Sequence, residues 1–368
     1  MINTESLYYN SVTIKVGSNV LTQSNGMLDY QRIEHLAAQI SDLHKHGTRV
    51  ILVSSGAVAA GRSMVQSNGT KDPVSQRQLL SSVGQVKLVN LYSQLFEDHN
   101  LTCAQVLVTK QDFSTREHYL NMKNCLSVLL DNGIVPIVNE NDAVSVTALM
   151  FTDNDELAGL LSSMMNTDAL FVLSNVDGIY TGMPGDEGAE LVPLIREGRE
   201  DLSSFISTTK SDFGRGGMLT KCRIAQKTAA SGINVHIANG TRDNIILDLA
   251  TSPESVQHTR FEANSPRPAI KKWMAYAEGF AKAEIVVNQG ARSALTGPKA
   301  RSVLLAGVVS FLGDFKKGDL LRIRDEEGVL IGIGRAQYEK ALAERHLEDD
   351  KYRPLVHYDY LFIFPDVH

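Results

Sequence analysis

Short β-branched runs alternate with longer helical patterns over residues 10–250, and this alternation leaves few folds open to the chain. In the helical patterns apolar residues recur every three or four positions, as Ile33, Leu36 and Ile40 do. Strands that are apolar on both faces and separated by helices form parallel sheets between two helical layers. We therefore predict an α/β fold, a three-layer sandwich around a mainly parallel sheet. The predicted strands are Val12–Val16, Arg49–Val53, Thr102–Val108, Gly133–Val138, Ala169–Leu173 and Asn234–Ala238, and the predicted helices are Tyr30–His46, Ser75–Glu97, Glu117–Leu130, Leu157–Met164 and Met218–Ser231.

The last third of the chain has a different pattern. Residues 251–268 are polar and irregular, and after residue 283 short apolar runs are separated by turns that contain glycine. At roughly 150 residues per domain, a chain of 368 residues has room for more than one. We predict an α/β domain over residues 1–255, a linker over 256–278 and a small β-rich domain over 279–368. The predicted strands of the second domain are Ile285–Asn288, Val303–Phe311, Asp319–Arg324 and Val329–Arg335.

Composition argues against several classes of protein. The net charge of −6 is unlike that of a non-specific nucleic-acid binder. The three cysteines lie far apart and form no C-x-x-C pair, so neither a disulfide framework nor a zinc site is predicted. Met1–Asn10 lacks the pattern of a signal peptide, and the longest apolar stretch, Ser302–Leu312, is far shorter than the roughly 20 residues that span a bilayer. We predict a cytoplasmic protein without a membrane partner.

The common nucleotide-binding motifs are absent from the sequence. Gly56–Gly61 has the glycine spacing of a P-loop, but Arg62 and Ser63 follow where lysine and serine or threonine are needed. The sequence has no H-R-D or D-F-G set of a protein kinase, and no G-x-G-x-x-G follows the first predicted strand. A nucleotide must therefore be held in another way.

Two loops directly after predicted strands have the composition of anion sites. A lysine such as Lys15, at the end of a buried strand, is costly unless its ammonium group meets an anion, and Gly17 allows the backbone to approach a phosphate. Ser55 and Gly56 open a predicted helix, whose free N–H groups favour a phosphate or a substrate carboxylate. Local sequence alone supports equally well a lysine that reaches solvent and a plain helix N-cap by Ser55.

Polar side chains also cluster in Asn139–Asp142, after a predicted strand, and in Asp153–Asp155, shortly before a predicted helix. Carboxylates and amides suit an α-ammonium group or magnesium-bound phosphates. Either cluster alone is equally consistent with a solvated loop, but that interpretation weakens because both flank the same strand–helix unit.

A glycine-rich segment, Gly214–Lys221, precedes another predicted helix. A flexible surface turn is the alternative to a phosphate loop there, and we favour the phosphate loop because a helical pattern follows at once. Transfer of a phosphoryl group from ATP to a carboxylate needs no strong base, because the nucleophile is already an anion. Lys15 and Lys221, together with Mg²⁺, would supply the positive charge that stabilises the transferring group.

Taken together, these segments resemble the motifs of the amino acid kinase family, in particular its members that phosphorylate glutamate. They occur in the family order, and the resemblance covers essentially the whole chain. Toward the C-terminus, Ala283–Gly290 and Phe315–Asp319 are similar to the PUA domain that many of these kinases carry. The five matching segments of the kinase part are Lys15–Leu21, Ser54–Gly61, Asn139–Val144, Asp153–Ala158 and Gly214–Lys221.

The resemblance implies transfer of the γ-phosphoryl group of ATP, with Mg²⁺, to the side-chain carboxylate of L-glutamate. It implies catalytic roles for Lys15, Lys221 and Asp155, with Asp155 orienting the two lysines. The implied binding residues are Ser55, Asp142 and Asn154 for glutamate, and Lys15, Ser174, Asn175, Arg215, Gly216, Gly217, Met218, Leu219, Thr220 and Lys221 for the nucleotide.

Two departures from the family pattern fall on the nucleotide side. Ser174 and Asn175 stand where the family often has Thr-Asp, and Arg215 stands where its glycine loop often has threonine. They bear on the details of ATP binding more than on the reaction.

The resemblance further implies proline as a feedback inhibitor, a homo-oligomer (dimer or tetramer) and functional coupling to glutamyl phosphate reductase. Two alternatives stay open at this point: a related kinase acting on aspartate or N-acetylglutamate, and RNA binding through the PUA domain. Residues 279–368 contain 13 Lys and Arg against 13 Asp and Glu, whereas RNA-binding surfaces carry a basic excess. We therefore do not expect nucleic-acid binding.

Overall fold

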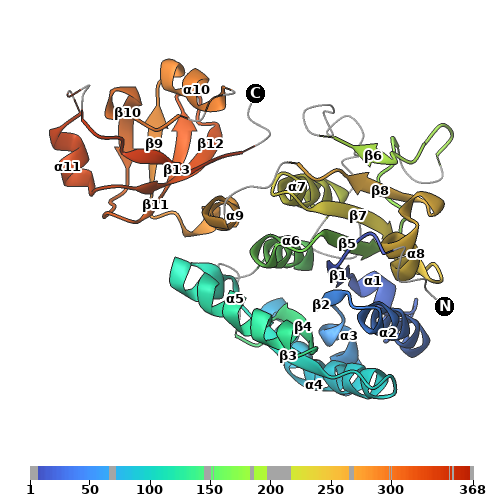
Figure 1. Ribbon diagram of the computed structural model, residues 1–368. Helices are drawn as coiled ribbons and strands as arrows, with labels where there is room; N and C mark the ends of the chain where they lie inside the picture. Colours follow the sequence, from blue (N-terminus) through green and yellow to red (C-terminus); the bar gives the residue numbers. More distant parts are fainter. Residues whose placement is uncertain are drawn as a thin grey trace. The chain divides into compact units, whose positions relative to one another are not determined.

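The computed structural model describes residues 7–65, 72–144, 151, 153–182, 186–196, 217–264, 269–297, 299, 301–347, 349 and 352–364. The chain divides into two compact units, Met1–Pro266 and Arg267–His368 (Figure 1). None of the described helices combines the length and the hydropathy that a membrane crossing requires.

The first unit is built on an eight-stranded sheet in the order β3-β4-β2-β1-β5-β7-β8-β6. The first six of these strands are parallel, β8 runs antiparallel to β7, and β6 is parallel to β8. The predicted α/β fold is thus confirmed. The strands are β1 (Ser11–Val16), β2 (Arg49–Ser54), β3 (Cys103–Val108), β4 (Val135–Glu140), β5 (Ala169–Ser174), β6 (Leu194–Ile195), β7 (Asn234–Asn239) and β8 (His258–Phe261).

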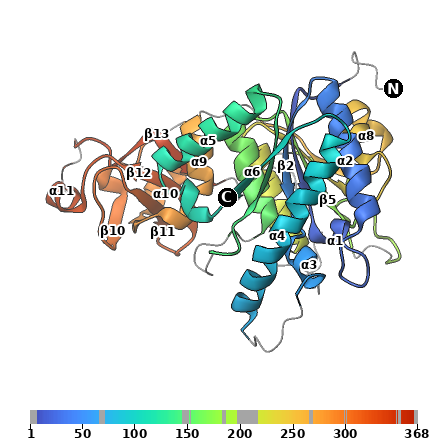
Figure 2. The ribbon, with the colours of Figure 1, turned by 90° about the horizontal axis from the view of Figure 1, so that it is seen from below.

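Helices cover both faces of this sheet. Figures 1 and 2 show α2, α4 and α8 on one face and α5, α6 and α7 on the other. Strands β1, β4 and β5 are almost entirely buried between the two layers, which explains why they are mainly apolar apart from a few polar residues such as Lys15 and Glu140. The helices are α1 (Ser18–Leu21), α2 (Tyr30–Lys45), α3 (Ala57–Arg62), α4 (Pro73–Glu97), α5 (Arg116–Asp131), α6 (Asn154–Met165), α7 (Met218–Ala229) and α8 (Ile245–Thr251), with a 3₁₀ turn, η2, at Lys110–Phe113.

The order of the strands creates a switch point at β1. The chain passes from β1 to β2 on one side, and β5 later pairs on the other side of β1. In open parallel sheets a crevice forms at such a point, outside the carboxyl ends of the strands. Lys15, Ser54, Glu140 and Ser174 stand at or next to the carboxyl ends of β1, β2, β4 and β5. The polar motifs of the sequence therefore meet at one edge of the sheet.

Helix α3 is held against α4 by two glycines. A Cβ atom at Gly84 would lie 1.8 Å from the carbonyl oxygen of Ala57, and one at Gly61 would lie 2.0 Å from the carbonyl oxygen of Leu80. Neither contact is physically possible, so the two backbones approach this closely only because both residues are glycine. This packing positions the Ser55–Gly56 turn, which α3 follows directly.

Gly84→Ala should therefore destabilise the protein by about 3 kcal/mol, because the helices must move apart. A loss of that size lowers Tm by about 6–12 °C in a domain of this size. Ser82→Ala is the matched control, since Ser82 is exposed on the same helix. Thermal unfolding of both variants checks the prediction, and an unchanged Tm for Gly84→Ala would contradict the close packing.

The second unit contains a five-stranded sheet in the order β10-β9-β11-β12-β13. The core on one side of the sheet is made of buried aliphatic residues such as Ile285, Leu321 and Ile323. Four of the strands had been predicted, within a few residues, and β13 had not. The elements are α9 (Ala269–Tyr276), β9 (Ala283–Val287), α10 (Gln289–Thr296), β10 (Val308–Leu312), β11 (Leu320–Asp325), β12 (Leu330–Ala336), α11 (Lys340–Arg345) and β13 (Val356–Ile363).

Strand β8 and helix α9 both fall within residues 256–278, the segment that the sequence predicts as a linker. The division of the chain into two compact units falls between Pro266 and Arg267. The three domain boundaries given by the sequence stay a prediction.

Candidate active site

A single buried carboxylate holds two lysines that come from distant parts of the chain. Asp155, in the first turn of α6, lies 2.5 Å from Lys15 Nζ through Oδ1 and 2.5 Å from Lys221 Nζ through Oδ2. The side chain of Asp155 is 1% exposed, and those of Lys15 and Lys221 are 6% and 14% exposed. Strand β1 supplies one lysine and the first turn of α7 the other.

The charges of this Lys–Asp–Lys cluster do not cancel. Burial alone would raise the pKa of Asp155, but the ammonium groups of Lys15 and Lys221 outweigh burial and hold that pKa well below its usual range. Burial lowers the pKa of Lys15, whereas the pKa of Lys221 is raised, because Asp155 more than offsets the burial of that ammonium group. With all three groups ionised the cluster carries one excess positive charge, so it favours an anion.

Asp153 fixes the start of α6. Its Oδ1 accepts hydrogen bonds from the backbone N–H groups of Asp155 (2.9 Å) and Glu156 (3.1 Å), the usual contacts of an N-cap residue. This cap fixes the first turn of α6, from which the side chains of Asn154 and Asp155 project. The structure thus gives Asp153 a positioning contact that the sequence did not assign to it.

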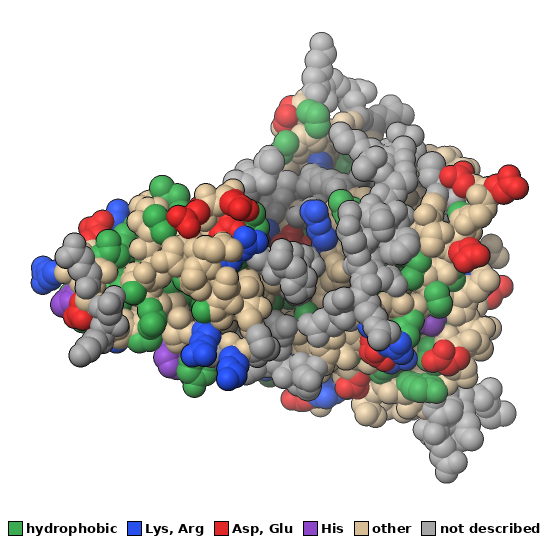
Figure 3. All heavy atoms as spheres, turned by 90° about the horizontal axis from the view of Figure 1, so that it is seen from above, with side chains coloured by type: hydrophobic (Ala, Val, Ile, Leu, Met, Phe, Trp, Pro, Cys, Tyr) green, Lys and Arg blue, Asp and Glu red, His purple; other side chains and the backbone are tan. Residues whose placement is uncertain are grey.

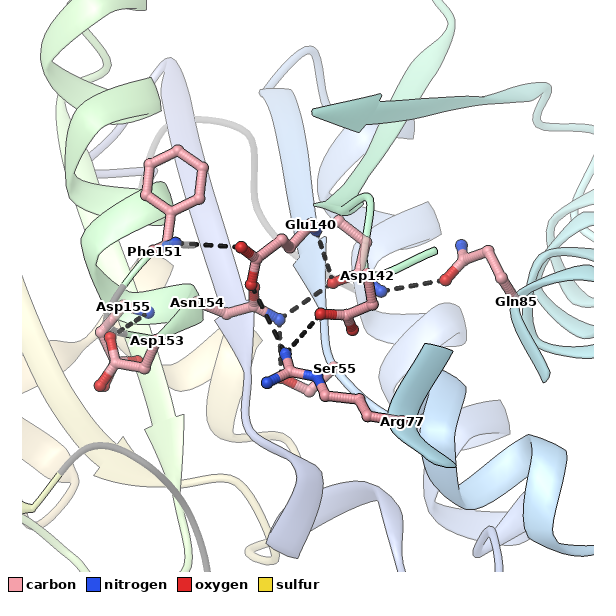
Figure 4. A network of polar contacts seen from close by, with 10 residues as sticks. Ser55, Arg77, Gln85, Glu140, Asp142, Phe151, Asp153, Asn154 and Asp155 are labelled. Atoms are coloured by element: carbon pink, nitrogen blue, oxygen red, sulfur yellow. Dashed lines mark hydrogen bonds and ion pairs between the residues drawn. The ribbon is translucent and has the colours of Figure 1, made fainter. Parts of the chain in front are cut away.

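An amide network connects Ser55 and Asn154, two of the residues predicted to bind the substrate glutamate (Figure 4). Asn154 Nδ2 donates to Ser55 Oγ and to Asn139 Oδ1, each at 3.0 Å. Asn139 Nδ2 in turn donates to Gln85 Oε1 at 3.0 Å. Because each amide is held by the next, the side chains are oriented before any ligand arrives.

Asp142, the third residue predicted to bind glutamate, pairs with Arg77 of α4 and not with the amide network. Arg77 Nη2 lies 2.5 Å from Asp142 Oδ1 and 3.5 Å from Glu140 Oε2. Figure 4 shows Asp142 and Arg77 beside the amide network. The three residues predicted to bind glutamate therefore lie in one region, near the carboxyl ends of β2 and β4.

On the nucleotide side, Ser174 ends β5, and its hydroxyl lies 3.4 Å from Asn175 Oδ1. Gly217 precedes α7 as its N-cap, so Met218, Leu219, Thr220 and Lys221 form the first turn of that helix. Arg215 and Gly216 lie outside the described residues. The effect of Arg215 on nucleotide binding thus stays a prediction.

Gly17 keeps the backbone close to the lysine cluster. Its N–H donates to the carbonyl of Leu173 at 3.1 Å. A Cβ atom at this position would lie 3.4 Å from Lys15 Nζ and 3.3 Å from the oxygen of Leu173. A Cβ atom would therefore press on the carbonyl oxygen of Leu173 and come into contact with the ammonium group of Lys15.

Over the described ranges, no three His, Cys, Asp or Glu side chains are grouped so that they could hold a metal ion. The described site instead holds two lysine ammonium groups on the carboxylate of Asp155. This donor set fits phosphate oxygens and does not fit a divalent cation bound by protein side chains alone.

The model of the "Amino acid kinase family" matches residues 10–239 of the chain. The chain belongs to the amino acid kinase family. A model of the PUA domain matches residues 283–347, which lie in the second compact unit of this amino acid kinase.

Curated relatives align with this amino acid kinase over nearly their whole length. A protein of Bacteroides thetaiotaomicron named "Glutamate 5-kinase" is 50% identical, with 96% of this chain and 99% of the relative covered. A "Glutamate 5-kinase" of Chlorobaculum tepidum is 46% identical, with 97% and 98% covered. One of Vibrio vulnificus is 36% identical, with 92% and 90% covered.

Two residues of the site had no role in the sequence interpretation. Arg77 and Gln85 lie on α4, far from any predicted strand end. The signal that does exist is a polar side chain on the apolar face of a helix: Gln85 is 7% exposed and lies one turn from the buried residues Ser81 and Leu88. A buried polar residue at such a position needs a partner, which here is Asn139.

Proposed function

We propose that this amino acid kinase transfers the γ-phosphoryl group of ATP to the side-chain carboxylate of L-glutamate, giving L-glutamyl 5-phosphate and ADP. The observation that carries the reaction is the pair of lysines held on the buried carboxylate of Asp155, beside the amide network of Ser55 and Asn154. Full-length identity of up to 50% to proteins named glutamate 5-kinase supports the choice of acid.

In this mechanism the lysines act on the transferring group. Lys15 and Lys221 contact phosphate oxygens, and their charge stabilises the phosphoryl group as it moves between two anionic oxygens. Asp155 keeps both ammonium groups at one point of the crevice, so little reorganisation is needed when the nucleotide binds. The glutamate carboxylate is already ionised, which explains why no general base is needed next to it.

Magnesium enters this scheme with the nucleotide. When bound, Mg²⁺ would neutralise phosphate charge and orient the phosphates for transfer of the γ-phosphoryl group. Because the described part of the site has no cage of carboxylates, we propose that phosphate oxygens and water supply most of its ligands. Ser174, Asn175, Arg215, Gly216 and Gly217 to Thr220 would contact the nucleotide.

The amino-acid end of the substrate lies at the amide network in this proposal. Asp142 pairs with the α-ammonium group, and Ser55 and Asn154 bind the substrate by hydrogen bonds. Replacing Asp142 by alanine should raise the KM for glutamate about 10- to 100-fold, the effect of losing one charged hydrogen bond, while kcat and the KM for ATP stay within about threefold. Steady-state kinetics measure this, and an unchanged KM for glutamate would remove Asp142 from the substrate site.

The direct test of the reaction is hydroxamate formation. Hydroxylamine traps acyl phosphates, so the assay reports the proposed bond itself. We expect ATP- and Mg²⁺-dependent product with L-glutamate, and none with aspartate or N-acetylglutamate in parallel. Product with another acid alone would keep the lysine mechanism and overturn the substrate, and no product with any acid would overturn the reaction.

Several wider proposals rest on the relatives rather than on the geometry. The product is a labile acyl phosphate, so we propose that a glutamyl phosphate reductase consumes it, in the cytoplasm, on the route to proline. Proline is proposed to inhibit at or near the glutamate site, and the kinase to form a homo-oligomer (dimer or tetramer). We keep 1–255, 256–278 and 279–368 as the proposed kinase domain, linker and PUA domain.

We do not propose an RNA-binding role for the PUA domain. On the face of the second unit seen in Figure 3, basic and acidic side chains are interspersed. Arg322 and Arg324, which belong to the most basic stretch of that unit, both pair with Glu284, at 3.0 and 2.7 Å. Glu284 thus offsets one of these two positive charges, and the pairing holds both guanidinium groups in place.

A further inference from the structure

Two buried carboxylates share one guanidinium group beside the amide network. One nitrogen of Arg77, Nη2, faces both Asp142 and Glu140. The side chains of Glu140 and Asp142 are only 4% and 9% exposed. The other oxygen of Glu140, Oε1, accepts a hydrogen bond from the backbone N–H of Phe151 at 3.0 Å (Figure 4). Glu140 is therefore held in place from two sides.

The charges in this cluster are one short of balance. If Glu140 and Asp142 are both ionised, Arg77 neutralises only one of them. Glu156 of α6 also acts on Glu140, and it is itself paired with Lys110 of η2 at 3.1 Å. A net negative charge in a buried site is costly. The cluster therefore needs one more positive charge, either a proton or a cationic ligand.

The electrostatics identify where a proton would sit. Burial, and then the neighbouring charge of Asp142, raise the pKa of Glu140 to about 7. Burial also raises the pKa of Asp142, but Arg77 opposes that rise directly. In the empty site the missing charge is thus a proton on Glu140, held by about half of the molecules at pH 7 and by most of them at lower pH. In the occupied site it is the α-ammonium group of the substrate.

We propose that Arg77 and Glu140 are positioning residues of the amino-acid site: Arg77 holds Asp142 in place, and Glu140 loses its proton when the α-ammonium group binds. The carboxyl O–H bond of Glu140 breaks, the proton goes to solvent, and the new carboxylate charge balances the ammonium group. This inference rests on the proposed function, because it needs a substrate with an α-ammonium group at Asp142. It adds that glutamate binding is linked to proton release.

The test is the pH dependence of the KM for L-glutamate, measured by ADP release from the full-length kinase. Because only the ionised form of Glu140 accepts the ammonium group, the KM of the wild type should rise about tenfold between pH 8 and pH 6. Glu140→Gln keeps the acceptor for the N–H of Phe151 but has no proton to lose. Its KM should be higher at pH 8 and flat with pH. The KM for ATP should not follow this pattern in either protein.

Two controls separate this linkage from a structural effect. Asp131→Asn removes an exposed carboxylate that is paired with Arg49, and should keep the tenfold rise. Glutarate, which lacks the amino group, should show no rise in KM at low pH with the wild type. Arg77→Met should raise the KM for glutamate at every pH with kcat little changed, and Arg77→Lys should recover part of that loss.

A flat KM in the wild type, or an unchanged pH dependence in Glu140→Gln, would overturn the inference while leaving the proposed function standing. Failure of the wild type to phosphorylate glutamate at any pH would instead overturn the proposed function, and with it the inference.

Discussion

Replacing Lys221 by alanine should lower kcat about 10³-fold, a loss of about 4 kcal/mol in transition-state stabilisation. The KM for L-glutamate should stay within about threefold. Lys221 contacts Asp155 in the ground state, and the raised pKa of Lys221 keeps it charged at all working pH values. Its charge matters most when the phosphoryl group lies between donor and acceptor oxygens, so its loss falls on turnover rather than on binding.

The controls for this prediction lie on the same helix. Arg223 is exposed two residues further along α7, so Arg223→Ala removes one positive charge without touching Asp155. That variant should keep kcat within about twofold. Lys221→Arg keeps the charge but not the geometry of an ammonium group, and should recover only part of the activity. Near-normal turnover in Lys221→Ala would remove this lysine from the mechanism.

The sheet was predictable because its sequence is simple. Strands that are buried on both faces are mainly apolar, as most of these strands are. The six parallel strands all appear at their predicted places, shifted by at most two residues at either end. Helix α6 shows why ends are harder. Its predicted start was Leu157, where the apolar pattern begins, but the helix starts at Asn154 because Asp153 caps it. Because the first turn of α6 is polar, it has no apolar residues at helical spacing from which its start could be predicted.

Elements with mixed surroundings were missed. Strand β13 is buried at Val356, Leu361 and Phe362 and exposed at Tyr358 and Asp359, so neither a continuous apolar run nor a strict alternation marks it. Strands β6 and β8 pair with each other although α7, β7 and α8 lie between them in the chain, and the sequence has no local signal for such pairing.

The site was predictable in part for a different reason. Lys15, Ser55, Asp142 and Asp155 follow or end parallel strands, or begin a helix, and such positions meet at one edge of a sheet. The contact of Arg77 with Asp142 has no counterpart in the sequence, because it depends on how α4 packs. Their 65-residue separation is bridged only in the folded chain.

Asp155→Asn is the second variant for which we expect a large effect. It removes the only negative charge that touches Lys15 Nζ and Lys221 Nζ in the described structure, while the side chain keeps its size. Breaking a buried ion pair by removing one partner costs about 3–5 kcal/mol, because the remaining charge stays buried. We therefore expect a clear loss of stability, together with a loss of turnover of at least about 10³-fold.

The pH dependence of this loss has a definite sign. In the wild type the pKa of Asp155 is lowered by its lysines, so its stabilising contribution is present above the ordinary Asp pKa of about 3.9 and is lost only as the pH falls through the lower native value. In Asp155→Asn the two buried ammonium groups repel each other, and Lys15, whose pKa is already lowered by burial, loses its proton more easily. The variant should thus regain stability relative to the wild type as the pH rises from 7 to 9.

A nucleotide distinguishes this electrostatic account from a simple loss of packing. Because phosphates replace the missing negative charge, a non-hydrolysable ATP analogue with Mg²⁺ should raise the Tm of Asp155→Asn more than that of the wild type. Asp131→Asn, which removes one partner of an exposed pair 4.0 Å from Arg49, is the control and should shift Tm by little. A smaller rise in Tm for Asp155→Asn than for the wild type would contradict this account. It would mean that the two lysines are held in place by contacts other than their shared carboxylate.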